Sequence, residues 1–218
     1  MALDQTPLLE EKLNKNAMKQ FKTWFDEAES SGAIAEVDAA VLTTVDKELV
    51  PHSRCMKILD FNKKGFIFIT SLSSQKVEHF TQNSNVSLLF PWTDVNRQVS
   101  INGTVKKMND EKSEMYWDKG FNFWVKIGML INKQSSRVAS RQTIEKKFSK
   151  LTKYNDDSMH IKKPDHMCAF RIIPHSIEFF QGRSYKPTKT RRTFSYADRI
   201  KYTKDKDGSK WSMNRYWS

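Results

Sequence analysis

The sequence predicts a mainly β protein with several helices, in which antiparallel strands form a barrel and helices cover its ends. Many short β-like runs are separated by turn residues, and few long crossovers lie between them. The motifs GxGxxG and GxxxxGK[ST], typical of nucleotide-binding parallel sheets, do not occur. We therefore expect one domain over residues 1–218, with a helical segment at 1–35 and basic strands at 183–218.

The N-terminal elements follow from the spacing of apolar residues. From about Leu8 to Ser30 these residues recur at helical spacing, and Ser30-Ser31-Gly32 ends the pattern. This predicts an amphipathic helix. Three β-like runs at 39–45, 54–61 and 65–71 follow, separated by turns at 46–51 and 62–64. They predict a meander of three strands.

Further along, helical and β-like segments alternate. The segment SSQKVEHFTQN predicts a short helix opened by Ser73 or Ser74. Two more helices are expected at 109–119 and 136–153, and a polar loop at 154–166. Additional strands are expected at 86–92, 97–108, 168–174, 176–181, 191–203 and 210–217.

Composition limits the class of protein. The 218 residues are 38% hydrophobic and 28% charged, which is typical of a folded globular chain. No apolar run could span a bilayer, and the N-terminus does not resemble a signal peptide, so we expect a cytoplasmic protein with no membrane partner. Cys55 and Cys168 lack a CxxC or Cys/His cluster. Two buried free thiols are expected, with no disulfide and no metal site.

The chain is basic, with a formal net charge of +12. Eleven basic residues against three acidic ones lie between Arg183 and Ser218. This charge is compatible with nucleic acid, an anionic membrane, phosphorylated small molecules or a merely solvated basic face. Because no RNA-binding or helix-turn-helix signature accompanies the charge, a nucleic-acid partner is not expected.

The strand expected at 97–108 has an unusual polar face. Alternation directs Val99, Ile101 and Val105 to the core and Gln98, Ser100, Asn102 and Thr104 to the other side. A solvated face would more often carry charge. The neutral row is either wet surface or the lining of a site for a flat, polar, uncharged ring, whose edge Gln98 could meet as donor and acceptor.

Other residues suggest a phosphate site. Arg54 begins a strand, Lys76 lies in the first turn of a helix, and Gln134-Ser135-Ser136 precedes the helix expected at 136. Free backbone NH groups and the helix dipole favour an anion at such an end. The alternative is a well-capped helix without a ligand.

These features belong to a longer resemblance. In order and spacing, the chain resembles the pyridoxamine 5'-phosphate oxidase family in the segments SRCMKIL, GFIFIT, SQKVEHF, NVSLLFPW, RQVSINGTVKKM, KIGMLINKQSS and IEFFQGR. The resemblance runs from about Phe21 to Gly182, and the joint occurrence of RQV, KQSS and IEF[FW]QG is specific. It implies an antiparallel FMN-binding split β-barrel and a homodimer with FMN at the subunit interface.

The resemblance also implies a set of cofactor-binding residues. Arg54 and Lys76 would hold the FMN phosphate, Gln98 would contact the flavin, and Gln134 with Ser135 would reach FMN from the partner subunit. The whole implied set is Arg54, Cys55, Met56, Lys57, Ile58, Leu59, Ile69, Thr70, Gln75, Lys76, Gln98, Gln134, Ser135 and Phe180. Residues 54–59 would follow the cofactor through their backbone.

Some positions of this set depart from the family. Gln75 replaces a phosphate-binding arginine, Ile69 a tyrosine and Phe180 a tryptophan, and Thr190 falls where an FMN-binding arginine is expected. The loss of a charge-assisted phosphate contact costs roughly 1.5 to 3 kcal/mol. We therefore expect weakened, not abolished, FMN binding.

The substrate side departs further. The family's lysine for the substrate phosphate falls at Leu59, followed by Asp60, and the segment 120–126 contains neither the family's arginine nor its serine. Tyr116 is retained. Lys186-Pro187-Thr188 replaces the family's Arg-Leu-His. Tyr116, Trp124 and Lys186 remain as candidate substrate residues, and no catalytic residue is identified.

Three functions are compatible with this pattern. The first is an FMN-dependent oxidoreductase acting on a less anionic, more aromatic substrate. The second is an authentic pyridoxine/pyridoxamine 5'-phosphate oxidase with a rebuilt substrate site, which makes pyridoxal 5'-phosphate. The third is a non-catalytic flavin-binding protein. The absent phosphate cradle favours the first.

Overall fold

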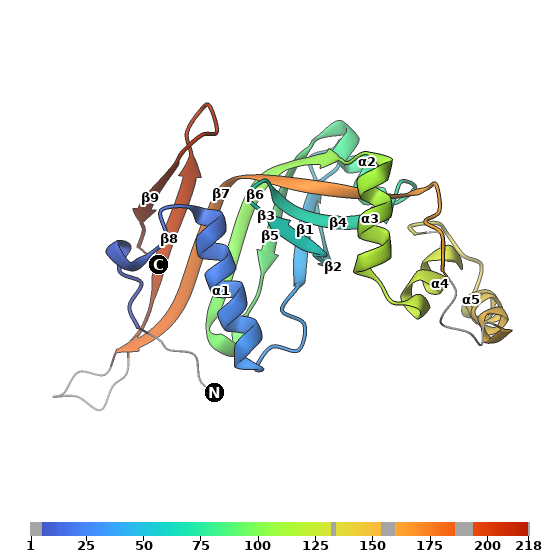
Figure 1. Ribbon diagram of the computed structural model, residues 1–218, viewed down its shortest axis with the longest axis horizontal. Helices are drawn as coiled ribbons and strands as arrows, with labels where there is room; N and C mark the ends of the chain where they lie inside the picture. The colour runs from blue at the N-terminus through green and yellow to red at the C-terminus, as the bar shows by residue number, and fades with distance from the viewer. Residues whose placement is uncertain (1–5, 132–133, 154–159, 186–193, 218) are drawn as a thin grey trace.

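A curled antiparallel sheet organises the molecule (Figure 1). The computed structural model describes residues 6–131, 134–153, 160–185 and 194–217. Within these ranges nine strands form one sheet in the order β2-β1-β5-β6-β7-β4-β3, with β8 on β7 and β9 on β8. The strands are β1 (Ala39–Val45), β2 (Pro51–Lys57), β3 (Asp60–Asn62), β4 (Gly65–Ser71), β5 (Asn85–Phe90), β6 (Arg97–Lys107), β7 (Met167–Tyr185), β8 (Phe194–Lys204) and β9 (Trp211–Arg215). The expected fold class is confirmed.

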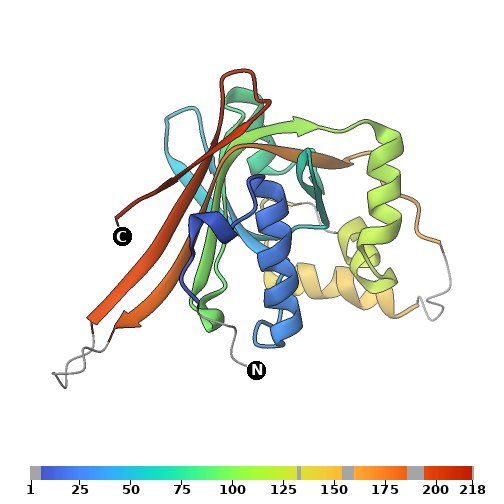
Figure 2. The ribbon, with the colours of Figure 1, turned by 60° about the vertical axis from the view of Figure 1, so that its left-hand side comes forward.

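The helices lie against the sheet and at one end of the molecule (Figure 2). They are α1 (Ala17–Ser31), α2 (Gln75–Gln82), α3 (Asp110–Gly120), α4 (Phe123–Ile131) and α5 (Arg141–Phe148), with short 3-10 turns at Glu10–Lys12, Thr93–Val95 and Ser149–Lys153. In the part of the chain described, none of them combines the length and hydrophobicity needed to cross a bilayer.

The N-terminal helix begins later than its apolar pattern suggested. Asn16 accepts hydrogen bonds from the backbone N–H groups of Met18 and Lys19, which fixes the start of α1 at Ala17. Gly32 ends the helix in the left-handed conformation that glycine adopts most easily. Of residues 6–15, only Glu10–Lys12 form a helical turn, which is of the 3-10 type.

Three other expectations about the elements were wrong, and one helix was missed. The run at 54–61 is two strands, because the chain leaves β2 after Lys57 and starts β3 at Asp60. The runs at 168–174 and 176–181 are one continuous strand, β7. The helix expected from 136 begins only at Arg141, where Ser140 caps it, and α4 was not expected.

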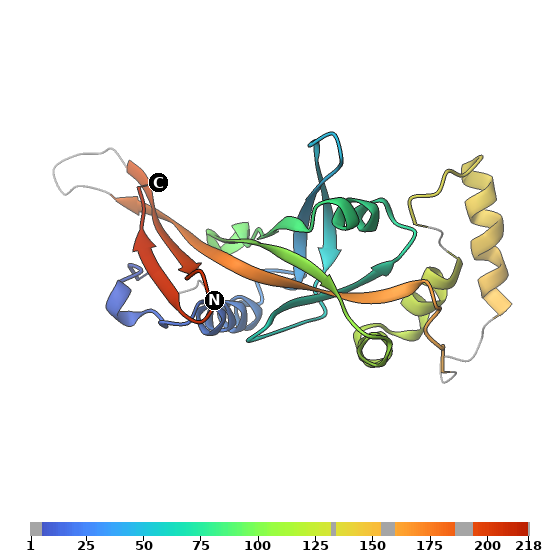
Figure 3. The same cartoon turned by 90° about the horizontal axis from the view of Figure 1, so that it is seen from above.

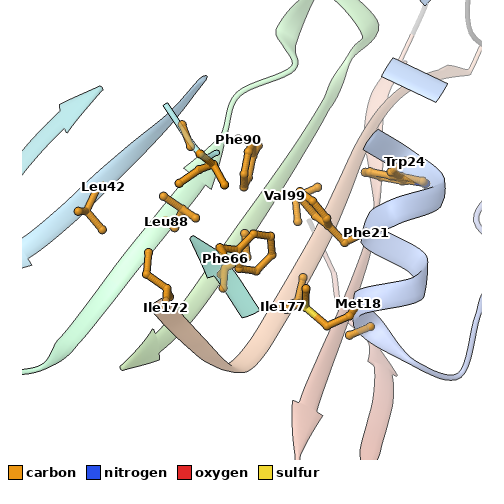
Figure 4. Close-up of a cluster of buried hydrophobic side chains, with 14 of the residues drawn as sticks. Met18, Phe21, Trp24, Leu42, Phe66, Leu88, Phe90, Val99, Ile172 and Ile177 are labelled. Carbon is orange, nitrogen blue, oxygen red and sulfur yellow. The ribbon is translucent and has the colours of Figure 1, made fainter. Parts of the chain in front are cut away.

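Two hydrophobic clusters stabilise the fold. In the first, Phe21 and Trp24 of α1 pack onto the sheet beside Phe66, Phe90 and other side chains (Figure 4). The second cluster joins β4 and β7 to α3 and α4, around the fully buried Trp117. The long strand β7 takes part in both clusters, and it runs along most of the molecule (Figure 3).

The two cysteines differ in exposure. Cys168 is buried as expected, whereas Cys55 is exposed, so the prediction of two buried thiols was wrong for Cys55. The cause is position, because Cys55 lies on β2 at the edge of the sheet and faces away from the core.

Candidate functional site

A group of polar side chains lies where β4 ends and α2 begins. We call Arg54, Thr70, Ser74, Lys76 and Gln134 the anion-binding cluster. Lys76 Nζ donates to Thr70 Oγ1 at 2.9 Å, and that hydroxyl donates to Gln134 Oε1 at 2.9 Å. Ser74 Oγ lies 3.3 Å from the Thr70 hydroxyl. Residues from three separate parts of the sequence thus form one polar site around the first turn of α2.

The two cations of this cluster repel each other. Burial, and secondarily the charge of Arg54, lowers the pKa of Lys76 to about 8. Burial also lowers the pKa of Arg54. Within the described ranges no carboxylate pairs with either group. Two neighbouring cations with hydroxyl groups beside them are a donor set that fits a phosphate dianion, such as that of FMN.

Arg54 is held by a relay of side chains that the sequence did not reveal. Its Nη1 donates to Thr44 Oγ1 at 2.7 Å and to the Leu42 carbonyl at 3.2 Å. Thr44 Oγ1 in turn lies 2.9 Å from Nδ1 of the buried His79. Burial lowers the pKa of His79, which favours its neutral form. This relay fixes the direction of the Arg54 guanidinium.

The relay continues to the surface. The His79 and His52 rings lie 4.8 Å apart, and His52 Nε2 is 2.7 Å from Asp46 Oδ2. The ligand-type atoms of these three residues lie within 4.8 Å of one another, a donor set that could hold a metal ion. No metal site was expected from the sequence, which does not reveal this group because its members are brought together only by the β1–β2 pairing and by α2.

Gln134 and Ser135 contact residues of their own chain. They were expected to reach the cofactor from a partner subunit. Here Gln134 accepts from Thr70 of its own chain, and Ser135 Oγ accepts from the backbone N–H of Gln75 at 3.1 Å. Gln134 therefore belongs to the anion-binding cluster of its own chain, and the hydroxyl of Ser135 binds the N-terminus of α2 beside it.

The polar face of β6 forms a second region. The expected alternation is confirmed, with Val99 and Ile101 fully buried and Gln98 and Ser100 half-buried. Gln98 lies directly opposite Phe180 of β7 in the strand register. We call Gln98, Ser100 and Phe180 the ring face, since they offer a half-buried surface with hydrogen-bonding groups beside an aromatic side chain.

The two regions lie on opposite sides of the sheet. Arg54 pairs with Leu42, Leu42 with Leu88, and Leu88 with Ile101, so Arg54 shares the core side of the sheet with Ile101. Gln98 is three residues from Ile101 along the same strand and therefore points to the other side. Within one chain, the anion-binding cluster and the ring face do not converge.

The segment 54–59 presents its backbone at an edge. β2 is the last strand on its side of the sheet, so one side of its backbone has no strand partner among the residues described. The side chains of Met56 and Ile58 pack toward the first hydrophobic cluster, whereas Cys55 and Lys57 point outward. A ligand along this edge would meet main-chain groups. Ile69, by contrast, is buried in the second cluster, where its side chain is unavailable to a ligand.

The substrate side contains one group that was expected and one that was missed. Tyr116 is nearly buried, and its hydroxyl donates to Asp60 Oδ2 at 2.9 Å. Burial, and secondarily this hydrogen bond, raises the pKa of Tyr116 to about 12. The missed residue is Arg171 on β7, whose guanidinium lies close enough to Tyr116 to oppose that rise. In the sequence Arg171 looked like an ordinary strand residue.

The other substrate candidates are not part of this group. Trp124 on α4 is 55% exposed and packs edge-on against Phe123. Leu59 lies against Gly120 at the end of α3, where an added Cβ at Gly120 would come within 2.8 Å of Leu59 Cδ1. The position of the family's lysine is therefore filled by an apolar contact. Lys186 lies outside the described residues.

Sequence comparison gives a consistent result. The family model described as pyridoxamine 5'-phosphate oxidase matches residues 26–155. A pyridoxine/pyridoxamine 5'-phosphate oxidase from Trichormus variabilis is 31% identical over 209 residues, which cover 95% of this chain and 91% of that protein. The chloroplastic pyridoxine/pyridoxamine 5'-phosphate oxidase 1 of Arabidopsis thaliana is 34% identical over 210 residues, and the chain spans 38% of its length.

Solved structures share the fold. A crystal structure of PhzG from Burkholderia lata, in complex with tetrahydrophenazine-1-carboxylic acid, matches with a TM-score of 0.83 at 18% identity and covers 100% of both chains. A pyridoxamine 5'-phosphate oxidase-related, FMN-binding protein from Nostoc punctiforme matches with a TM-score of 0.71 at 11% identity, covering 94% of this chain and 100% of that one. At these identities the likeness concerns the fold.

Proposed function

Because the chain belongs to the pyridoxamine 5'-phosphate oxidase family, we propose that it is an FMN-dependent oxidoreductase with a substrate other than the vitamin B6 phosphates. The observation that carries the proposal is the anion-binding cluster, in which Arg54 and Lys76 lie together without a carboxylate partner in the described ranges. Bound FMN would supply the hydride-accepting ring, and the protein supplies position and electrostatics.

The residues of this chain have distinct roles in that proposal. Arg54 and Lys76 bind the phosphate of FMN, and Thr70 donates or accepts beside them. The open backbone edge of β2 would offer main-chain groups to the rest of the bound FMN. Gln98, with its amide donor and acceptor, hydrogen-bonds the polar edge of the ring, while Phe180 covers its apolar part.

A homodimer follows from the separation of these roles. The anion-binding cluster and the ring face lie on opposite sides of one sheet. A single FMN can contact both only if the ring face comes from a second copy of the chain. We therefore propose FMN at the interface of a homodimer, and we keep the prediction that this dimer is cytoplasmic.

The surroundings of Leu59 support the proposal that the substrate is not a vitamin B6 phosphate. Its side chain contacts Gly120, and the adjacent Asp60 places a negative charge beside Tyr116. A phosphate dianion needs convergent cations. If two charge-assisted contacts are lost at roughly 1.5 to 3 kcal/mol each, affinity falls by about two to four orders of magnitude.

The second candidate is an authentic pyridoxine/pyridoxamine 5'-phosphate oxidase. The names of relatives that cover 95% of the chain at 31% to 34% identity favour it. In that case Arg171, or basic residues of 183–218, would take over the lost phosphate contacts.

The visible absorption spectrum of the purified, FMN-supplemented protein tests the proposal, followed by anaerobic mixing with pyridoxamine 5'-phosphate. We expect a yellow protein that this compound does not bleach. A protein that takes up no FMN at micromolar concentration contradicts the proposal. Rapid bleaching, with a catalytic efficiency near about 10⁴ M⁻¹s⁻¹ in a steady-state assay, would favour the second candidate.

A further inference from the structure

Arg171 carries a buried donor without an acceptor. Its Nε is the one buried side-chain nitrogen or oxygen in the described ranges that lacks a hydrogen-bond partner. A guanidinium stays protonated, and a buried donor without an acceptor is costly. The side chain as a whole is only partly buried, so its other N–H groups are accessible. An unsatisfied donor beside an accessible cation indicates a missing anionic partner.

The strand register defines what surrounds Arg171. Asp60 pairs with Ile67, Ile67 with Arg171, and Arg171 with Lys106, so these four side chains form one row on the same side of the sheet. Helix α3 packs over β4 and β7 on this side and brings Tyr116 to the row. Ile67 is fully buried, and the adjoining, partly buried Leu59 adds apolar surface.

The hydroxyl of Tyr116 connects the two charges of the row. It donates to Asp60 at 2.9 Å and lies beside the Arg171 guanidinium. Asp60 therefore has a partner, whereas Nε of Arg171 has none in the described ranges. Besides the exposed Lys106, the row offers one partly buried cation, one nearby negative charge and an apolar flank.

We propose that Arg171 is the binding site for a carboxylate of the substrate, with Tyr116 positioning it; this inference rests on the proposed function. A carboxylate is planar and monoanionic, and it matches the fork of a single guanidinium. A phosphate dianion would be repelled by Asp60, and Lys106, the other cation of the row, is exposed to solvent and therefore contributes little. The partly buried Leu59 favours an apolar body, so the substrate class is a carboxylate with an apolar body.

Calorimetric titration of the FMN-loaded protein tests this site with three probes of one shape, 1-naphthoate, 1-naphthamide and 1-naphthyl phosphate. We expect naphthoate to bind at least about tenfold more tightly than the neutral amide or the phosphate. Arg171→Gln should weaken naphthoate by about tenfold or more and leave the amide unchanged. Lys107→Gln removes the same charge from the neighbouring strand on the opposite side of the sheet, and it should leave naphthoate within about twofold of wild type.

Equal binding of naphthoate and naphthamide, or naphthoate affinity unaltered by Arg171→Gln, would overturn the proposal. Tighter binding of naphthyl phosphate than of naphthoate would overturn the carboxylate class. If Arg171→Gln does not fold, Arg171→Lys keeps the charge but loses the fork, and it should weaken naphthoate selectively; an unchanged affinity counts against the site. Failure to take up FMN contradicts the proposed function, whereas lost discrimination in FMN-loaded protein contradicts only the Arg171 site.

Discussion

The anion-binding cluster and the ring face differ in how far a single chain completes them. In the cluster, Thr70 contacts Lys76, Ser74 and Gln134, and Arg54 is oriented by Thr44. The ring face instead presents the half-buried Gln98 and Ser100 on a strand that is otherwise buried in alternation. The first region is preorganised within the chain, and the second is an open surface. We infer that phosphate affinity is built into each chain, while contact with the ring depends on assembly.

The largest effect is expected from Arg54→Ala. It removes a charge-assisted contact to a dianion and leaves the Thr44 hydroxyl without its donor. We expect FMN affinity to fall by about 10-fold to 150-fold, from roughly 1.5 to 3 kcal/mol. Fluorescence titration of FMN measures this. Arg141→Ala is the control, because Arg141 is 88% exposed and pairs only with Glu145 in the described structure, so its loss should not alter FMN binding.

The pH dependence of FMN binding should follow Lys76. In the absence of FMN the pKa of Lys76 is about 8, so its side chain loses its positive charge above that pH. A bound dianion favours the charged form, so FMN binding is coupled to proton uptake in this range. Affinity should therefore be constant from pH 7 to near 8 and then fall by up to about tenfold per pH unit. The Lys76→Arg variant keeps its positive charge, so its affinity for FMN should not fall between pH 8 and 9.5. If its affinity falls as that of the wild type does, another group titrates.

A smaller effect is expected from Thr44→Val, which preserves shape and removes the hydroxyl between Arg54 and His79. The loss of one net hydrogen bond, about 1 kcal/mol, should weaken FMN about fivefold by leaving Arg54 less well oriented. Thr43→Val is the matched control, since Thr43 bonds only Ser53 on the other side of the strand in the described structure. If both variants bind FMN equally well, the relay does not orient Arg54.

The strands of the core could be predicted from the sequence for a physical reason. Alternation of Val99 and Ile101 with Gln98 and Ser100 reports burial directly, and the structure confirms the two sides of β6. Helix α4 was missed because its apolar residues cover several faces, so the run from Phe123 lacks a helical period.

The site was only partly predictable. The family resemblance pointed to Arg54, Lys76 and Thr70, and the structure brings all three into the anion-binding cluster. Thr44 and His79 gave no signal, because their meeting depends on which strands pair and on where α2 lies. Arg171 was hidden for the same reason, since its neighbours come from β3 and α3.

The most direct test of the account is complementation between two defective variants. Arg54→Ala destroys the anion-binding cluster, and Gln98→Glu places a carboxylate on the ring face. Each variant alone should bind FMN weakly. If one FMN contacts the cluster of one chain and the ring face of another, unfolding and refolding an equal mixture should restore about a quarter of the wild-type sites, because each mixed dimer has one intact site. If both variants still dimerise but the refolded mixture shows no tight FMN binding, that result would contradict a site shared between two chains.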